Sequence, residues 1–249
     1  LFLYSIFKFE TKLILRISGL PNINLIRKQF WKFTLKNVYK ITCPTEATKN
    51  DLIKLNICEK EKIYVLHDPI IKIKEIVKKK KDKIEDKFNY NYFISIGRLT
   101  KQKNFAFLLD CFKKLVDNDN KYKLVIIGSG EDKNKLTEKI NKLNLNKNVE
   151  MLGYIDNVYP YLSKAECFFL PSLWEDPGFV LVEAAVSNTL IISSNCKNGP
   201  SEILNEGKGG YLYQVNSEED FLKKFNEIKK NAKEINLRKK IVSKKNVKK

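Results

Sequence analysis

Short apolar segments alternate with helix-forming segments along much of this 249-residue chain, and this alternation constrains its fold more than any other feature. Apolar runs bounded by polar turns predict strands over residues 92–97, 123–128, 149–154, 167–171, 190–194 and 210–214. Between them, apolar residues recur at the spacing of one helix face, as in Phe105, Leu108, Leu109 and Phe112. Buried strands that alternate with helices predict a parallel sheet covered on both faces, which is the doubly wound α/β class.

The first part of the chain has a less regular pattern. Residues 38–45 and 62–70 read as strands, and Thr45 is a suitable N-cap for a helix between them. Four consecutive lysines at 78–81 then lie in a charge-dense stretch of the kind that is usually solvated. We therefore expect a first domain over 1–75, a basic linker over 76–91, the α/β domain over 92–235 and a basic tail over 236–249.

Polar loops follow four of the predicted strands. They are RLTKQK (98–103), SGED (129–132), GYIDN (153–157) and WEDPG (174–178). Ligands of doubly wound sheets bind outside the carboxyl ends of the strands, where such loops meet. The sequence therefore predicts one functional edge built from these four loops.

The segment PSLWEDPGFVLVEAAVS, residues 171–187, carries two glutamates with seven residues between them. Asp176 is a good N-cap residue and Pro177 suits the first helical position, so we expect the helix to begin there. Glu175 would then lie just outside the helix, close to the free amides of residues 178–180. Because a helix N-terminus favours negative charge, we expect an anionic ligand nearby.

Glu183 lies inside a nearly all-apolar run, where a lone buried carboxylate is costly unless something satisfies it. Its carboxylate could accept two hydrogen bonds from the hydroxyls of a ribose. The alternative is that Glu183 bonds a backbone group or a neighbouring lysine. Its spacing alone does not decide between these two interpretations.

A second group of candidate residues lies in the loop GRLTKQK. Gly97 ends a strand and allows a tight turn, while Arg98 and Lys103 would project from the edge of the sheet. Arginine in a bidentate fashion and lysine as a point charge could together grip a diphosphate. The glycine turn at 128–131 also suits close approach of a ligand, although it matches neither GxGxxG nor a P-loop.

The chain has a formal net charge of +18, with 47 Lys and Arg against 29 Asp and Glu. Such an excess suits nucleic acid, an anionic membrane surface or an acidic substrate. Residues 1–33 combine aromatics with cations and are the candidate for a surface that touches lipid, with ordinary helices as the alternative. No basic helix with interleaved base-stacking aromatics supports nucleic acid, so we expect none as a partner.

Five scattered cysteines without zinc-ligand spacing indicate reduced thiols in a cytoplasmic protein. There is no signal-peptide pattern and no apolar run long enough to span a bilayer. The chain begins with Leu1 and its one methionine is Met151, so we expect a fragment that has lost its start.

Taken together, these motifs resemble the retaining GT-B glycosyltransferases of the glycosyltransferase 4 family, whose C-terminal half is the group 1 glycosyltransferase domain. The matching stretches are SIGRLTKQKNFAFLLDCF, KLVIIGSGED, VEMLGYIDNVYPYLSKAECFFLPSLWEDPGFVLVEAA and IISSNCKNGPSEILNEGKGGYLY. They cover about residues 92–215 in the family's order. The stretches ITCPTEATKNDL and YVLHDPI look like the end of the family's N-terminal domain, which implies a partial Rossmann-like domain before the donor-binding one.

The resemblance assigns roles to particular residues. Arg98 and Lys103 match the pair that binds the donor diphosphate and stabilises it as the leaving group. Glu175 matches the carboxylate that contacts the hydroxyls of the donor sugar and is counted with these two as catalytic, while Glu183 matches the one that holds the nucleotide ribose. The full donor-binding set implied is Gly97, Arg98, Lys103, Gly153, Tyr154, Glu175, Gly178, Phe179, Val180, Leu181 and Glu183. No metal and no cofactor is expected, because cationic side chains would do the work of a metal.

The resemblance implies an enzyme that moves a sugar from a nucleotide diphosphate sugar to an acceptor with retention of configuration. The expected acceptor is a glycan or a lipid-linked glycan in bacterial surface polysaccharide synthesis. The expected location is the cytoplasm, peripheral to the inner face of the membrane. The alternative is a non-catalytic nucleotide-sugar-binding module, because most of the acceptor-side domain is missing. The sequence also departs from the family's pattern, with EDPGF where EGFG is usual and a tail that stops before the expected final helix.

Overall fold

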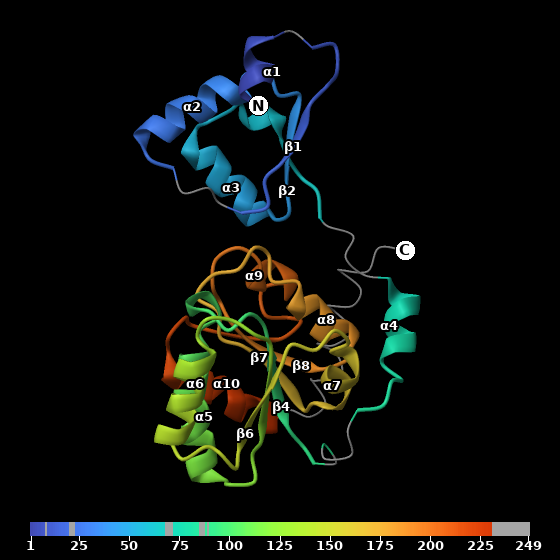
Figure 1. Cartoon of the computed structure of the whole chain (residues 1–249), viewed down its shortest axis with the longest axis vertical. Helices are drawn as coiled ribbons and strands as arrows, with labels where there is room; N and C mark the ends of the chain where they lie inside the picture. The colour runs from blue at the N-terminus through green and yellow to red at the C-terminus, as the bar shows by residue number, and fades with distance from the viewer. Residues whose placement is uncertain (8, 20–22, 68–71, 85–87, 89, 231–249) are drawn as a thin grey trace. The chain divides into compact units, whose positions relative to one another are not determined.

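A computed structural model of the chain describes residues 1–7, 9–19, 23–67, 72–84, 88 and 90–230. The chain divides into two compact units, Leu1–Pro69 and Ile70–Lys249, and each is described by itself (Figure 1). The second unit holds all of the predicted site residues.

The second unit is built on a six-stranded sheet in the order β6-β5-β4-β7-β8-β9, and every paired strand runs parallel to its neighbour. Its strands are β4 (Phe93–Ile96), β5 (Leu124–Ile127), β6 (Val149–Gly153), β7 (Cys167–Leu170), β8 (Leu190–Ser194) and β9 (Tyr211–Tyr213). From β4, the strands β5 and β6 are added in sequence order on one side. The next strands, β7, β8 and β9, are added in sequence order on the other side of β4. The order of the strands therefore reverses between β4 and β7, which is where doubly wound sheets bind their ligands.

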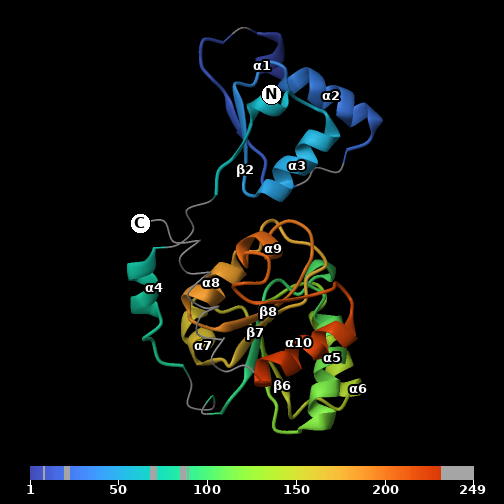
Figure 2. The same ribbon diagram turned by 180° about the vertical axis from the view of Figure 1, so that it is seen from behind.

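Helices cover both faces of this sheet (Figures 1 and 2). They are α5 (Phe105–Asn118), α6 (Lys133–Lys142), α7 (Tyr159–Lys164), α8 (Val180–Val186), α9 (Pro200–Ile203) and α10 (Glu218–Lys230), with a 3-10 turn η3 at Lys101–Lys103. Helix α4 (Ile73–Lys79) lies outside these layers and contacts α7. One apolar core joins the sheet to α5, α6 and α10, and the other joins it to α7, α8 and α9. Because both faces are buried, the strands read as continuous apolar runs in the sequence.

The lysine-rich stretch belongs to the second unit. It contains helix α4, whose Ile76 is buried, and it continues to Ile84 and Phe88, which pack into the core beside α7 and α8. The unit begins at Ile70, whereas we expected a domain boundary at 75 and a linker over 76–91. Three buried apolar side chains among the lysines anchor this stretch, which the charge pattern alone does not reveal. The expected boundary at 235 and the tail 236–249 lie outside the described residues.

The first unit is a small three-stranded parallel sheet in the order β1-β2-β3. Its elements are α1 (Phe2–Ile6), β1 (Ile14–Arg16), α2 (Leu25–Leu35), β2 (Lys40–Cys43), α3 (Glu46–Leu55), a 3-10 turn η1 (Lys60–Lys62) and β3 (Ile63–Val65). Its core gathers Leu35, Ile41, Leu52 and Ile63 from four of these elements. As the sequence predicts, the hydroxyl of Thr45 caps α3 by accepting a hydrogen bond from the amide of Thr48 at 3.0 Å. Among the described residues of either unit, no helix is both long and apolar enough to cross a bilayer.

Candidate active site

Two loops meet where the strand order reverses. One follows β4 and begins at Gly97, and the other follows β7 and carries Glu175. Gly128, after β5, has φ of +145°, and a Cβ there would lie 1.8 Å from the carbonyl oxygen of Gly97. Any larger residue would therefore push the loop after β4 out of place.

These loops and the start of α8 enclose a pocket of about 400 Å³. Its lining residues are Ile96, Gly97, Arg98, Gln102, Lys103, Glu175, Asp176, Gly178, Phe179, Val180 and Glu183. The pocket thus combines two cationic side chains from the first loop with three acidic side chains from the second loop and α8.

A buried ion pair connects the two sides of the pocket. The Nζ atom of Lys103 lies 2.6 Å from Oε1 of Glu175, and their side chains are only 12% and 4% exposed. The hydroxyl of Ser172 donates a second hydrogen bond to the same oxygen at 2.5 Å. The stem of Lys103 packs against Gly97, where a Cβ would lie 3.3 Å from its Cδ and Cε. Glu175 is therefore held in one orientation by two donors, with little freedom to move.

Backbone and amide hydrogen bonds join the same two loops. The side-chain amide of Gln102 donates to the carbonyl of Trp174 at 2.9 Å, and the amide of Leu173 donates to the carbonyl of Gln102 at 2.8 Å. On the other side, the amide of Glu175 donates to the carbonyl of Lys197 at 3.1 Å. The segment around Glu175 is therefore positioned by contacts far away in the sequence.

Helix α8 begins at Val180, with Phe179 as its N-cap, and not at Asp176 and Pro177 as the local sequence predicts. Gly178 has φ of +86°, which a right-handed helix does not allow, so residues 176–178 form a turn before the helix. Gly199 packs beneath this turn, where a Cβ would lie 1.7 Å from the carbonyl oxygen of Pro177. The Asp-Pro-Gly turn thus lengthens the loop and keeps Asp176 at the pocket.

Glu183 lies in the first turn of α8 and differs from Glu175 in its surroundings. Among the described residues its carboxylate has no hydrogen-bond or ion-pair partner, so neither a backbone group nor a lysine satisfies it there. Burial raises the pKa of Glu183 above the usual range of a glutamate. Burial also raises the pKa of Asp176, where a hydrogen bond from Asn198 opposes the rise and the charge of Glu175 adds to it. A half-buried carboxylate without a partner is the kind of group that a ligand hydroxyl would satisfy.

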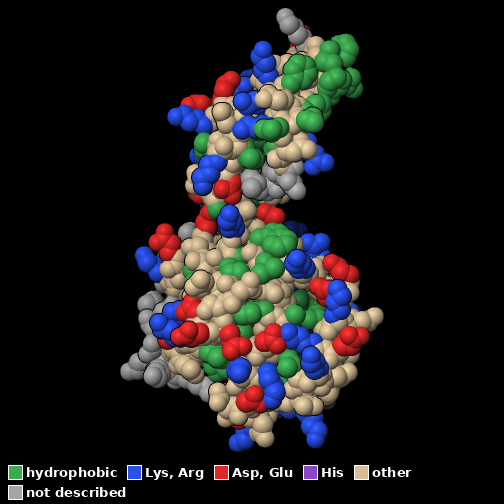
Figure 3. Space-filling model, turned by 90° about the vertical axis from the view of Figure 1, so that its left-hand side faces the viewer, with side chains coloured by type: hydrophobic (Ala, Val, Ile, Leu, Met, Phe, Trp, Pro, Cys, Tyr) green, Lys and Arg blue, Asp and Glu red, His purple; other side chains and the backbone are tan. Residues whose placement is uncertain are grey.

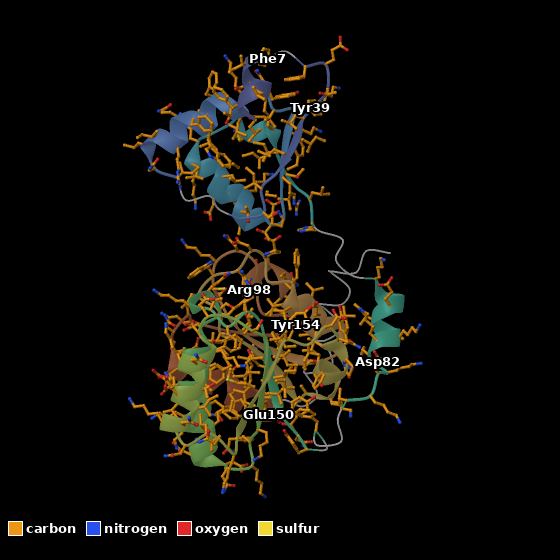
Figure 4. The ribbon with its side chains drawn as sticks, in the orientation of Figure 1. Phe7, Tyr39, Asp82, Arg98, Glu150 and Tyr154 are labelled. Atoms are coloured by element: carbon orange, nitrogen blue, oxygen red, sulfur yellow. The ribbon has the colours of Figure 1, made fainter. Side chains whose placement is uncertain are left out.

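Arg98 is exposed and follows β4 at the carboxyl end of the strand. Within the described part of the chain, its side chain has no hydrogen-bond or ion-pair partner. Figure 4 shows Arg98 and Tyr154 toward the same end of the second unit, whereas Glu150 lies toward the opposite end. The guanidinium is therefore available to a ligand at the edge where the pocket opens.

Eight of the residues expected to bind a donor line the pocket, namely Gly97, Arg98, Lys103, Glu175, Gly178, Phe179, Val180 and Glu183. Leu181 does not line it, because its side chain is fully buried and its amide donates to the carbonyl of Gly178 at 3.0 Å. Gly153 and Tyr154 do not line it either, and the side chain of Tyr154 is 76% exposed after β6.

Three further residues line the pocket and were not predicted from the sequence, namely Ile96, Gln102 and Asp176. The position of Gln102 within the same loop as Arg98 and Lys103 could have suggested it. Asp176 was interpreted as a helix cap, and only the turn at Gly178 places it at the pocket. Among the described residues, no three His, Cys, Asp or Glu side chains gather to form a metal site.

The family described as Glycosyl transferases group 1 matches residues 76–247. An uncharacterized glycosyltransferase of Methanocaldococcus jannaschii is 48% identical over 112 residues, which is 45% of this chain and 28% of that protein. The N-acetylgalactosamine-N,N'-diacetylbacillosaminyl-diphospho-undecaprenol 4-alpha-N-acetylgalactosaminyltransferase of Campylobacter jejuni is 27% identical over 219 residues, which is 84% of this chain and 58% of that protein. The chain therefore spans less than two thirds of the length of these relatives.

Among solved structures, HepE of Anabaena in complex with UDP has a TM-score of 0.79 and 14% sequence identity. The likeness covers 94% of this chain and 67% of HepE. At this identity the likeness establishes a shared fold.

Proposed function

Because the chain belongs to the glycosyl transferases group 1 family and has the GT-B fold, we propose that it is the donor-binding part of a glycosyltransferase. The whole enzyme would move a sugar from a nucleotide diphosphate sugar to a glycan or lipid-linked acceptor, with retention of configuration. It would act as a member of the glycosyltransferase 4 family in bacterial surface polysaccharide synthesis. The observation that carries this proposal is the pocket that both Arg98 and Glu183 line, where neither side chain has a hydrogen-bond or ion-pair partner among the described residues.

The cations of the pocket would bind the donor diphosphate. Arg98 offers a planar set of donors that matches phosphate oxygens, and Lys103 adds a point charge at the base of the same loop. As the bond from the sugar to the diphosphate breaks, negative charge grows on the leaving oxygen. Positive groups already in place stabilise that charge more than they stabilise the intact donor, and this difference lowers the barrier.

The carboxylates would bind hydroxyl groups of the donor. Glu175 already accepts two hydrogen bonds through Oε1, which fixes the plane of its carboxylate for a sugar hydroxyl. Glu183 would accept hydrogen bonds from the ribose, which would supply the partner that its carboxylate lacks among the residues the structure describes. Gly178, Phe179 and Val180 border the same pocket and would lie along the sugar and phosphates.

We place the acceptor at the inner face of the cytoplasmic membrane. This assignment draws on the C. jejuni relative, whose name specifies an acceptor attached to diphospho-undecaprenol. An enzyme that uses such an acceptor would work from the cytoplasm as a peripheral membrane protein. In this proposal the reaction needs no metal and no cofactor, because Arg98 and Lys103 neutralise the leaving group. Transfer that continues at full rate in excess EDTA would agree, and transfer that stops would contradict it.

A thermal-shift panel of UDP-, GDP-, ADP- and dTDP-sugars tests donor binding directly. We expect one of them to raise the melting temperature of the chain, because a ligand that binds only the folded state stabilises it. Glu183→Ala should lose that rise, whereas Glu138→Ala, an exposed glutamate on α6, should keep it. If no nucleotide sugar stabilises the chain, or if Glu183→Ala responds as the parent does, the site assignment is wrong.

A second candidate function is donor binding without transfer. It is favoured by the position of the pocket, because all of its lining residues belong to the second unit. The two candidates separate in one assay that follows release of the nucleotide diphosphate in the presence of lipid-linked glycan. Binding in the thermal-shift panel without acceptor-dependent release identifies a binding module.

A further inference from the structure

Asp176 is a pocket residue to which the proposed binding of the donor assigns no role. It lines the pocket together with Glu175 and Glu183, and the residue is exposed, so its carboxylate can reach a ligand there. In the proposed function, the diphosphate belongs to Arg98 and Lys103 and the ribose to Glu183. The part of the donor nearest to Asp176 is then the sugar, which Glu175, its neighbour in the chain, would contact.

The Asp-Pro-Gly turn holds Asp176 at the pocket. Pro177 and Gly178 are buried, and a Cβ on Gly199 would lie 1.7 Å from the carbonyl oxygen of Pro177. A Cβ on Gly178 would lie 3.1 Å from Cγ of Glu175, so the turn folds back closely on that side chain. Close packing therefore fixes the backbone that follows Asp176, and the free chain already presents this residue to the pocket.

The charges of the pocket leave Asp176 without a cation. Two cationic and three acidic side chains line the pocket. Lys103 and Glu175 form an ion pair, and Arg98 would bind the diphosphate. Among the described residues, Asp176 has no ion-pair partner, and its hydrogen bond comes from the neutral side chain of Asn198. The charge of Asp176 would therefore act directly on the sugar of a bound donor.

The pocket is small enough for this charge to act throughout it. A sphere of about 400 Å³ is about 9 Å across, close to the distance over which salt screens exposed charges. The whole chain, with its net charge of +18, would by contrast attract anions in general. Figure 3 shows basic and acidic side chains interspersed over one face of the second unit. Rejection of an anionic sugar would therefore have to come from the pocket and not from the surface.

We propose that Asp176 makes this pocket select donors with an uncharged sugar and reject donors whose sugar carries a carboxylate. A uronic acid differs from its parent hexose by a carboxylate in place of a hydroxymethyl group. The hydroxyls of a neutral sugar can donate hydrogen bonds to Asp176, which still has acceptor capacity beyond its bond from Asn198. A second carboxylate would instead place like charges together, and such repulsion is a common source of specificity. This inference rests on the proposed function, because it names the class of sugar that the donor would carry.

Isothermal titration calorimetry with matched donors tests the inference. Each probe pair joins one nucleotide diphosphate to glucose and to glucuronic acid, with UDP, GDP, ADP and dTDP in turn. The free nucleotide diphosphates are the references. For the nucleotide that binds, we expect the glucose donor to bind roughly tenfold more tightly than the glucuronic acid donor, as for two like charges several ångströms apart near a protein surface. Raising the salt concentration should narrow this difference.

Isosteric variants assign the difference to one side chain. Asp176→Asn removes the charge and keeps an oxygen that can accept the hydrogen bond from Asn198. It should bind the glucuronic acid donor roughly tenfold more tightly than the parent does and leave binding of the glucose donor nearly unchanged. Glu138→Gln removes one negative charge at an exposed position of α6 outside the pocket, and it should keep the parent's ratio of affinities. Asp176→Ser is a second variant without the charge, and circular dichroism shows whether each variant is folded.

The outcomes separate this inference from the proposed function. Equal affinities of the parent for the two donors of a pair would overturn the inference and leave donor binding intact. A ratio like that of the parent in both Asp176→Asn and Asp176→Ser would also overturn it, because another group would then exclude the acid. If neither the nucleotide diphosphates nor any donor binds, the proposed donor binding is itself wrong and the inference fails with it.

Discussion

The loop that carries Glu175 and the helix that carries Glu183 line the same pocket, yet they hold their carboxylates in different ways. Glu175 is buried and accepts hydrogen bonds from Lys103 and Ser172. Glu183 is partly buried, has no hydrogen-bond partner among the described residues, and has a raised pKa. The difference suggests a division of roles, in which the protein orients one acid in advance and leaves the other for the ligand.

Lys103→Met should have the largest effect, because it leaves the buried carboxylate of Glu175 without its cation. Breaking one partner of a buried ion pair typically costs about 3 kcal/mol, and urea unfolding measures this loss in the free energy of unfolding. Lys101→Met, at an exposed lysine of the same turn, is the control. The double variant Lys103→Met/Glu175→Gln should recover part of the loss. If the double variant loses as much free energy of unfolding as the two single variants lose together, the two residues are not coupled.

Ser172→Ala should have the next largest effect. It removes the hydroxyl that donates to Glu175 and should lower the free energy of unfolding by about 1–2 kcal/mol. It should also weaken stabilisation by the best nucleotide sugar, because Glu175 would no longer be held in one orientation. Ser163→Ala, on α7 outside the pocket, removes a hydroxyl that donates to the carbonyl of Pro160 at 2.9 Å, and it should leave donor stabilisation unchanged. Equal donor stabilisation in Ser172→Ala and the parent would show that Lys103 alone orients Glu175.

Glu183→Gln should change how stability depends on pH. Because the pKa of Glu183 is raised in the folded chain, the unfolded chain loses this proton first as pH rises. The parent's stability therefore falls as pH rises between the usual value of 4.5 and the raised value, and this contribution is absent in the variant. In chemical unfolding, the free energy of unfolding of Glu183→Gln relative to that of the parent should be higher above this pH window than below it. A difference that is the same at every pH would contradict the raised pKa.

Gln102→Ala should have the smallest effect on stability. Its side-chain hydrogen bond to the carbonyl of Trp174 is exposed, so water can replace it at a cost of about 0.5 kcal/mol. We expect a larger effect on donor affinity, because this bond joins the two loops that carry Lys103 and Glu175. Gln214→Ala, after β9, serves as the comparison for a glutamine outside the pocket. Equal donor affinity in both variants would show that the loops need no such connection.

The fold of the second unit could be predicted from the sequence because its signals are local. The apolar runs at 124–127 and 167–170 are strands, and the spacing from Phe105 to Leu115 produces the buried side of α5. Ser217 caps the start of α10, where its hydroxyl accepts a hydrogen bond from the amide of Asp220 at 3.2 Å. Periodicity and capping depend on neighbours a few residues apart, so they remain visible in the chain alone.

Other features depended on contacts between distant residues. The local pattern predicts a helix start at Asp176. The positive φ of Gly178 is not helical, so α8 begins only at Val180. The charge pattern suggested a solvated linker, but Ile84 and Phe88 pack into the core of the second unit. The spacing of Glu183 left open whether the protein satisfies its carboxylate, and the environment in α8 supplies no such partner among the described residues.

The sequence by itself determined the alternation of strands and helices and the set of loops that would share one edge. The tertiary structure decided which members of those loops meet. Lys103 and Glu175 are far apart in the sequence, and they come together because β4 and β7 are neighbours where the strand order reverses. Local sequence sets the conformation of short segments, whereas a pocket depends on long-range packing that brings distant loops within a few ångströms.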